Sequence, residues 1–503
     1  MIDKIVFTID SCSENGDEFG LNEAIECCYN YLDSLNDCDC DVPLVHYFVA
    51  NAYSAIRDIE KSRGNISDWD WENDARSKEL LHLRKCISSS SFKQLDKTRQ
   101  CQALTNLANL LSNTGRPIQA IKIWNRAIEV DSFFSMAIFN KALGLHSYAG
   151  LLFDDGHKFL FFQEIYKIYR LANEPKYLFG LEQFSAKSIT GMASEFCTWW
   201  SSNKSEIAEQ LKMYHNYISD YDESLGNSKE EVAYRNWCLE HILFINPLND
   251  LGRYKLAGRD ICFIPSMTLK VGEGPFLQAL YQQMVHEYGS SRYLFYQALQ
   301  NKRDSHFCMS DIFYVDTSDS PQHGYWIDMI KASFKIIYGI FDKIGTFISK
   351  YYTVESKAVY FKTIWYKKQK KENGLLDIFT AAENHVFRGL YWLSKDLMGD
   401  LDETNGSEFC VEPAARKIAL LRNRMEHGYV RVIDENNHPS SLDSDFAMVI
   451  TLDELVNKTY DLFSLVREAL MCLAMAVNGE EINKTNSTDG HVFSIGLPIS
   501  KNM

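Results

Sequence analysis

An arginine and a histidine that could act together on a phosphate ester lie in the last fifth of the chain. The segment 422–429 reads RNRMEHGY and places Arg422 and His427 five residues apart. An imidazole can take up and release protons near neutral pH without a metal ion. A guanidinium stays cationic and can hold phosphate oxygens while negative charge develops on them. This pair therefore has the functional groups for metal-independent chemistry at a phosphodiester.

The five-residue spacing determines how the two groups could meet. On an α-helix such residues point about 140° away from each other, so one helix does not aim both at one atom. A two-fold homodimer that apposes two copies of the helix could, because each copy then contributes to a shared cleft. Asn423 shares a helix face with His427 and could accept a hydrogen bond from one imidazole nitrogen, which fixes the tautomer. Arg422, Asn423 and His427 are therefore candidate catalytic residues, and a shared site for them would require a dimer.

The same residues allow a purely structural interpretation. Arg422 and Glu426 are four residues apart, so they could form an ion pair on a solvated helix face. Two further arginine–histidine spacings occur, and each is expected to be structural. Arg76 and His82 lie in a polar stretch of the first region. Arg235 and His241, with an asparagine after the arginine, precede the helical bundle, and whether they form a second site stays open.

The elements that must position these residues are predicted to be helices. Only 10 prolines interrupt the chain, and apolar residues recur every three or four positions. Five long helices are expected at 276–300, 326–352, 375–398, 412–432 and 452–477, with Pro413 suited to a first turn. The predicted fold is all-α, with a five-helix bundle over 275–480 and a polar tail over 481–503.

The region before this bundle carries a repeat pattern. Over 103–132 the order of large, small and aromatic residues follows the 34-residue TPR pattern, with a turn at Gly115-Arg116-Pro117. A TPR-like helical array is therefore predicted over 1–190. It is followed by a connecting helical or irregular region over 191–274, in which 260–265 could be a short strand or an extended segment. Such arrays bind peptides or proteins and do no chemistry themselves.

Charge and cysteine content restrict the partners. A formal net charge of −15 argues against non-specific coating of nucleic acid, but allows a local basic cleft. The lysines at 367–371 are expected to form a solvated helix end.

The 13 cysteines include no C-x-x-C pair, so neither a metal nor another cofactor is expected. No signal peptide and no membrane span is predicted, and scattered reduced thiols indicate the cytoplasm.

The motif resembles the R-x4-6-H signature of HEPN ribonucleases, in the form with asparagine after the arginine. It also resembles the R-x4-H-x-Y form of HEPN toxins. The segments 237–238, 246–250, 287–292 and 390–397 are similar to a bacterial HEPN subfamily in which helical repeats precede the nuclease bundle.

This resemblance implies attack of an RNA 2′-hydroxyl on the adjacent phosphorus, with Arg422 and His427 catalytic. It implies a toxin or antiphage effector regulated through the array. Further candidates are then cleft or RNA contacts at Glu287, Arg292, Arg424, Lys367 and Lys368, and a modification site at Tyr429. Glu287 and Arg292 could equally form structural ion pairs. A non-catalytic scaffold and a nucleotide-binding HEPN domain are the alternatives.

Overall fold

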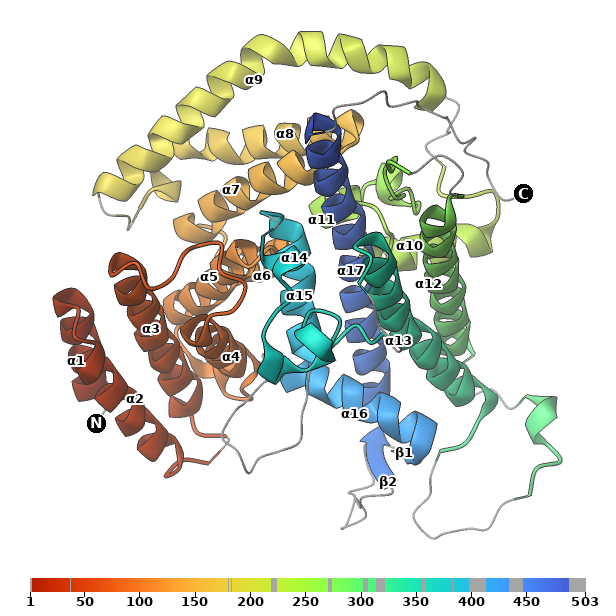
Figure 1. Ribbon diagram of the computed structural model, residues 1–503, viewed down its shortest axis with the longest axis horizontal. Helices are drawn as coiled ribbons and strands as arrows, with labels where there is room; N and C mark the ends of the chain where they lie inside the picture. Colours follow the sequence, from red (N-terminus) through yellow and green to blue (C-terminus); the bar gives the residue numbers. More distant parts are fainter. Residues whose placement is uncertain are drawn as a thin grey trace.

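The computed structural model of the chain is almost wholly helical (Figure 1). It describes residues 2–36, 38–179, 181, 183–218, 224–269, 274–301, 306–313, 322–354, 359–381, 383–397, 413–433 and 447–487. These ranges contain 17 α-helices and one two-stranded sheet. The predicted all-α fold class is confirmed.

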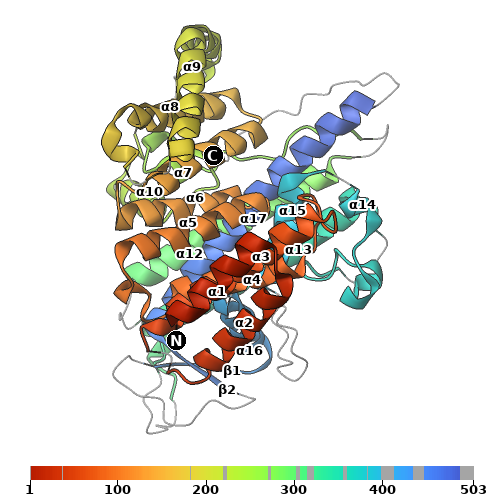
Figure 2. The same cartoon turned by 90° about the vertical axis from the view of Figure 1, so that its left-hand side faces the viewer.

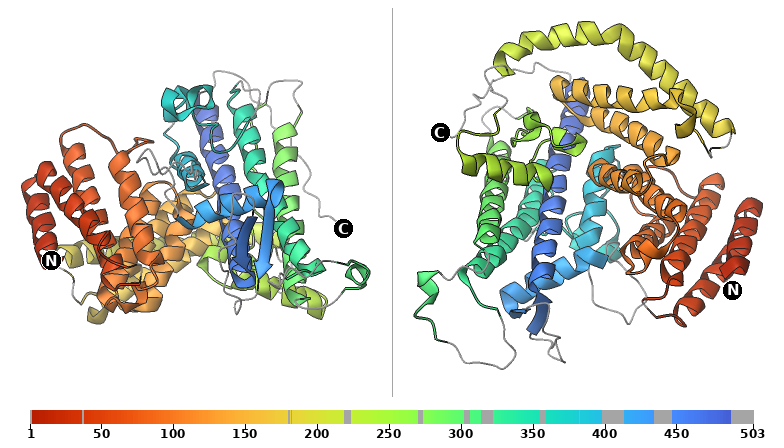
Figure 3. Two further views of the ribbon diagram at one scale, coloured as in Figure 1. Left: turned by 90° about the horizontal axis from the view of Figure 1, so that it is seen from below. Right: turned by 180° about the vertical axis from the view of Figure 1, so that it is seen from behind.

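Nine helices make up the first part of the chain. Each packs against the next, and the stack lies beside the C-terminal helices (Figures 2 and 3), while the ninth helix arches over the top of the molecule in Figure 1. Their starts follow from sequence, because Asp17, Asn73, Asp96 and Asp154 each accept a hydrogen bond from the backbone N–H three residues later. The helices are α1 (Ile2–Asn15), α2 (Glu18–Leu32), α3 (Asp41–Ser62), α4 (Asp74–Ser88), α5 (Lys97–Asn113), α6 (Pro117–Val130), α7 (Ser135–Leu151), α8 (Asp155–Arg170) and α9 (Gln183–Ile218).

The predicted repeat over 103–132 forms the hairpin of α5 and α6. The residues at its large, small and aromatic positions are buried: Leu104, Leu107, Ala108, Leu111, Ala120, Trp124 and Ala127. Gly115 makes the turn with a φ of +89°, a conformation that favours glycine. Pro117 starts α6, where no hydrogen bond from its nitrogen is needed. The hairpin agrees with the pattern; its TPR character stays a prediction.

The predicted boundary at residue 190, between the array and the connecting region, falls inside helix α9, whereas the next predicted helix is shorter than expected. The amphipathic helix predicted at 230–245 is α10 (Lys229–Glu240), and it ends early because Ile242 has a positive φ of 54°. The short α11 (Leu248–Leu251) follows. Residues 260–265 form neither a helix nor a strand, and the N–H groups of Ile261 and Cys262 donate to the Ile245 carbonyl at 3.2 and 3.0 Å.

The C-terminal helices match the expected positions in outline. They are α12 (Phe276–Gln300), α13 (Tyr325–Tyr351), α14 (Asp377–Thr380), α15 (His385–Leu397), α16 (Pro413–His427) and α17 (Leu452–Ser487). The third predicted helix, 375–398, is two helices, α14 and α15. The fifth continues through the expected start of the polar tail as far as Ser487, and residues 488–503 lie outside the described part.

The fourth predicted helix, 412–432, ends earlier than expected. After His427 the chain becomes strand β1 (Tyr429–Ile433), which pairs in parallel with β2 (Ala447–Thr451). The sequence contains the signals for this change: Gly428 suits a helix end, and Val430, Val432 and Ile433 are β-branched. His427 is therefore the last residue of α16, directly before the strand.

Helix α17 is the centre of the C-terminal region. The stretch Leu452–Lys484 could cross a membrane by length and composition, but 78% of its most apolar window is buried inside the protein. In Figure 1, α17 and α15 lie between the helical stack and the pair α12–α13. Burial on several sides accounts for the apolar composition of α17.

The helical stack and the C-terminal helices are joined by buried ion pairs. Arg84 donates to both carboxylate oxygens of Asp396 in α15, at 2.5 and 3.1 Å. Arg116 donates to Asp396 and, at 2.8 and 3.0 Å, to Glu468 in α17. All four side chains are at most 4% exposed. We call this group the seam cluster.

A second buried group lies beside the seam cluster. Arg467 of α17 donates to Asp250 at 2.7 Å and to two backbone carbonyls. Asp250 also accepts from the hydroxyl of Tyr148 in α7, at 3.0 Å. The stack is thus packed against the C-terminal helices by polar groups that are satisfied only when both parts are folded.

Replacement of Gly389 by alanine is expected to destabilise the protein by about 1–3 kcal/mol, because overpacking outweighs the helix propensity of alanine. A Cβ at this position of α15 would lie 2.0 Å from the carbonyl oxygen of Gly115. Gly339→Ala in α13 is the matched control, since its Cβ would meet nothing within 4 Å. Urea unfolding checks both; a Gly389→Ala variant as stable as Gly339→Ala would contradict the close approach of α15 to the α5–α6 turn.

Candidate functional site

The C-terminal end of α16 presents the predicted catalytic residues at the surface. Arg422 is half-buried, whereas Asn423 and His427 are exposed. The helix can end here because Gly428 follows, and its N–H donates to the Arg424 carbonyl at 3.0 Å. No described residue hydrogen bonds to the His427 imidazole, so its ring nitrogens are available to a substrate or a second copy of the chain.

Arg422 is held against α13. Its guanidinium carbon lies 5.5 Å from the centre of the Tyr338 ring, a cation–π contact. Asp342 is one turn further along α13. Burial raises the pKa of Asp342, and the nearby Arg422 opposes that rise. Burial also raises the pKa of Tyr338 to about 12. The Tyr338 ring thus positions the arginine.

The side-chain contacts within the motif differ from those expected. Asn423 Oδ1 accepts a hydrogen bond from Arg422 Nη1 at 3.2 Å, so it does not fix the His427 tautomer in this structure. Glu426 lies 3.8 Å from Lys335 of α13, which corrects the expected ion pair with Arg422. Neither the solvated ion pair nor the imidazole contact is present among the described residues.

Two lysines of α13 add positive charge beside the motif. Lys331 donates to the Val430 carbonyl at 3.3 Å, and burial lowers its pKa. Lys335 is one turn away and faces Glu426. Together with the half-buried Arg424 they make this end of the molecule locally basic. Sequence analysis missed Lys331, Lys335, Tyr338 and Asp342, whose spacing on one face of α13 was the available signal.

Arg292 does not line an exposed cleft. It is 4% exposed and donates to Asp260 at 2.6 and 2.9 Å and to the Leu243 carbonyl at 2.8 Å. This corrects the cleft assignment and supports the structural alternative. Glu287 forms an ion pair with Lys343 of α13. This contact supports the structural ion pair over the cleft contact for Glu287 as well.

The remaining candidates are Lys367 and Lys368, proposed as RNA contacts, and Tyr429, proposed as a modification site. Lys367 and Lys368 lie in a short turn, with Lys367 2.8 Å from Asp377. Neither lysine forms an ion pair with a described residue of α16, so an RNA contact there stays a prediction. Tyr429 is 41% exposed at the start of β1, which leaves it accessible to modification.

The rival motif at Arg235 and His241 has structural contacts. Arg235 donates to Glu231 at 2.7 Å and to the Gly258 carbonyl at 3.2 Å. The His241 ring lies 4.5 Å from that of Tyr460, and burial lowers the pKa of this histidine. These contacts favour a role in packing α10 against α17.

His82 of the other rival motif is buried in the stack. Its Nδ1 lies 3.0 Å from Nδ1 of His46, and its Nε2 lies 3.0 Å from the Tyr29 hydroxyl. Burial lowers the pKa of His46 to about 4, and burial together with His46 lowers that of His82 well below its ordinary value. Lys85 acts in the same direction on both. Both imidazoles are therefore neutral in the folded protein at pH 7.

The free energy of unfolding is expected to fall as the pH drops from about 6.5 toward 4. Unfolded histidines take up protons from about pH 6.5 downward, whereas folded His46 does so only near pH 4. The loss is up to about 3 kcal/mol for His46. Urea unfolding at pH 7 and pH 5 measures it, and His82→Gln should flatten the pH dependence while exposed His427→Ala should not. Equal wild-type stability at both pH values would contradict the neutral pair.

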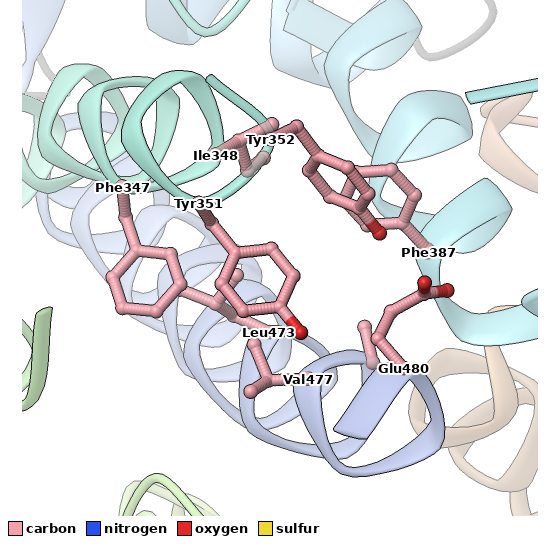
Figure 4. Close-up of a pocket in the computed structure, with 9 residues that line it drawn as sticks. Phe347, Ile348, Tyr351, Tyr352, Phe387, Leu473, Val477 and Glu480 are labelled. Atoms are coloured by element: carbon pink, nitrogen blue, oxygen red, sulfur yellow. The ribbon is translucent and has the colours of Figure 1, made fainter. Parts of the chain in front are cut away.

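A small apolar pocket lies away from the motif (Figure 4). It is lined by side chains of α13, α15 and α17, including Tyr351, Tyr352, Phe387 and Glu480, and leaves room for about one water molecule. Asn384 donates to Glu480 at 2.8 Å. Among the described residues no three histidine, cysteine, aspartate or glutamate side chains gather as metal ligands, including Cys27, Cys28, Cys38 and Cys40.

Residues 268–480, from the segment before α12 to the last turns of α17, match the family model described as LA2681-like HEPN. This stretch is therefore similar to a HEPN domain, which agrees with the family that the motif resembles. Among curated proteins and solved structures nothing matches the chain.

Proposed function

We propose that the HEPN-like domain is a metal-independent endoribonuclease whose catalytic residues are Arg422 and His427. The observation that supports this most directly is the exposed end of α16, where His427 has no hydrogen bond to a described residue and Arg422 is held by Tyr338. Both side chains lie inside the segment that matches a HEPN family. A merely structural pair would be expected to be satisfied internally, as Arg235 is.

In the proposed reaction the 2′-oxygen of one nucleotide forms a bond to the adjacent phosphorus while the bond to the 5′-oxygen breaks. The 2′-hydroxyl gives its proton to the His427 imidazole, and the departing 5′-oxygen takes a proton from the imidazolium so formed, which leaves the histidine neutral again. Arg422 stabilises the charge on the phosphoryl oxygens. The products are a 2′,3′-cyclic phosphate and a 5′-hydroxyl, and DNA is inert because it lacks the nucleophile.

The active unit in this proposal is a homodimer. Arg422 contacts α13, whereas His427 lies at the opposite, exposed side of the helix end. A two-fold axis beside α16 would bring the arginine of one copy near the histidine of the other. The helical stack would receive a protein or peptide trigger, as expected for a toxin or antiphage effector.

Incubation of the full chain with total RNA in EDTA tests this proposal. Cleavage of RNA, with single-stranded DNA left intact, is the expected result. RNA that stays intact at every protein concentration, although the protein binds it, would favour a non-catalytic scaffold. Cleavage that requires added magnesium would contradict the metal-independent mechanism.

A further inference from the structure

Two buried arginines without a carboxylate partner lie where the stack meets α15. Arg76 of α4 and Arg388 of α15 are 3% and 2% exposed. Arg76 donates to the Asp70 carbonyl at 3.1 Å. Arg388 donates to the Asn113 carbonyl at 2.6 Å and to the Asp68 carbonyl. All these acceptors are neutral backbone groups, and neither arginine forms an ion pair with a described residue.

The acidic side chains near these two arginines interact with other groups. Asp68 forms an ion pair with Lys61 at 2.6 Å. The Asp70 carboxylate accepts a hydrogen bond from the Ser67 backbone at 2.9 Å. Glu79 is paired with Arg57 at 3.0 Å. The positive charge of Arg76 and Arg388 is therefore not neutralised in direct contact.

Burial lowers the pKa of both guanidiniums more than the nearby carboxylates of Asp68 and Asp70 raise it. Burial and the charge of Arg76 lower the pKa of Arg388 to about 10. Burial and the two arginines also lower the pKa of His385, whose Nδ1 is 3.2 Å from Arg388. Buried charges of one sign are costly unless an opposite charge compensates them. In addition, the Nε atoms of both arginines are buried without a hydrogen-bond partner.

We propose that Arg76 and Arg388 form a binding site for a phosphate group, at the junction of the 66–73 loop, the end of α5 and the start of α15. Two guanidiniums offer the planar pairs of donors that suit phosphate oxygens. The anion supplies the missing negative charge and replaces the carbonyls of Asp68 and Asp70 as acceptor. Those carbonyls belong to a loop without helix or strand, which can move aside.

An aromatic side chain lies beside this site. Trp69 is 46% exposed, and its ring lies 5.5 Å from the Arg388 guanidinium carbon and 6.2 Å from the His385 ring. The phosphate can thus be inorganic, or it can belong to a nucleotide whose base stacks on Trp69. Because the site touches both the stack and the C-terminal helices, its ligand holds these parts together.

Calorimetry of the full chain with sodium phosphate, at the ionic strength of a chloride reference, tests the site, and AMP serves as the second ligand. Binding is expected to weaken at least tenfold in Arg76→Gln and in Arg388→Gln. It should be unchanged in Arg63→Gln, an exposed arginine paired with Glu18. Trp69→Ala should weaken AMP but not phosphate if a base stacks there. Absence of binding, or binding weakened as much in Arg63→Gln, would overturn the proposal.

Hydrogen–deuterium exchange on the wild-type chain covers the case in which an arginine variant does not fold. Phosphate is expected to slow exchange in 66–76, 112–116 and 385–389 relative to chloride. Protection confined to other segments would place the anion elsewhere and refute the assignment.

Discussion

His427→Ala and Arg422→Ala are each expected to lower the rate of RNA cleavage at least about 100-fold. Proton transfer by a positioned imidazole and stabilisation of developing charge each contribute rate factors of this size. The variants should keep wild-type stability within about 0.5 kcal/mol, because His427 is exposed and Arg422 is half-buried at a helix end. Initial rates on a labelled RNA, with urea unfolding of the same samples, provide the measurement.

The rival motif supplies the matched control. His241→Ala removes an exposed histidine that follows an arginine at similar spacing, and it should cleave like the wild type. Tyr338→Leu removes the ring under Arg422 and should reduce activity by less than Arg422→Ala does. Equal losses of cleavage rate in His241→Ala and His427→Ala would show that His427 is not the catalytic histidine.

Asp396→Ala is expected to lower the free energy of unfolding by about 3–5 kcal/mol, the cost of breaking a buried ion pair by removing one partner. Asp396 accepts from both Arg84 and Arg116, and its side chain is fully buried. The Arg84 guanidinium, which also donates to Gln119 of α6 at 3.3 Å, would lose its contact with the Asp396 carboxylate. Urea unfolding at constant pH measures the loss.

Asp461→Asn is the control for this prediction. Its carboxylate is 47% exposed and lies 3.3 Å from Lys458 on the same helix. Such a pair contributes at most about 1 kcal/mol. An Asp396→Ala variant no less stable than Asp461→Asn would mean that the stack is not joined to the C-terminal helices through the seam cluster.

The sequence predicts the helices well because their signals are local. Phe276–Gln300 is found as expected, and the α5–α6 hairpin follows from Gly115 and Pro117. The seam cluster could not be predicted in this way. Ser394, Lys395 and Asp396 give α15 the appearance of a solvated face, yet they are buried, and Arg84 is 312 residues from Asp396. Their partners depend on tertiary packing.

The candidate site was predicted in part. The types and spacing of Arg422 and His427 carry chemical information, so they could be selected from sequence alone. The contacts of Arg422 with Tyr338 and of Lys331 with Val430 arise only when α13 packs against α16. Strand β1 was not predicted because the apolar spacing of a helix continues past Gly428, so the predicted helix included these residues.

Cleavage of an RNA oligonucleotide with a single 2′-deoxy substitution tests the central claim most directly. The scissile position is first mapped on the unmodified RNA, and the substituted strand is then incubated with wild-type protein in EDTA. The mechanism at Arg422 and His427 predicts that cleavage at that bond disappears while neighbouring sites remain. Cleavage at the unmodified rate would show that the 2′-oxygen is not the nucleophile and would contradict the account.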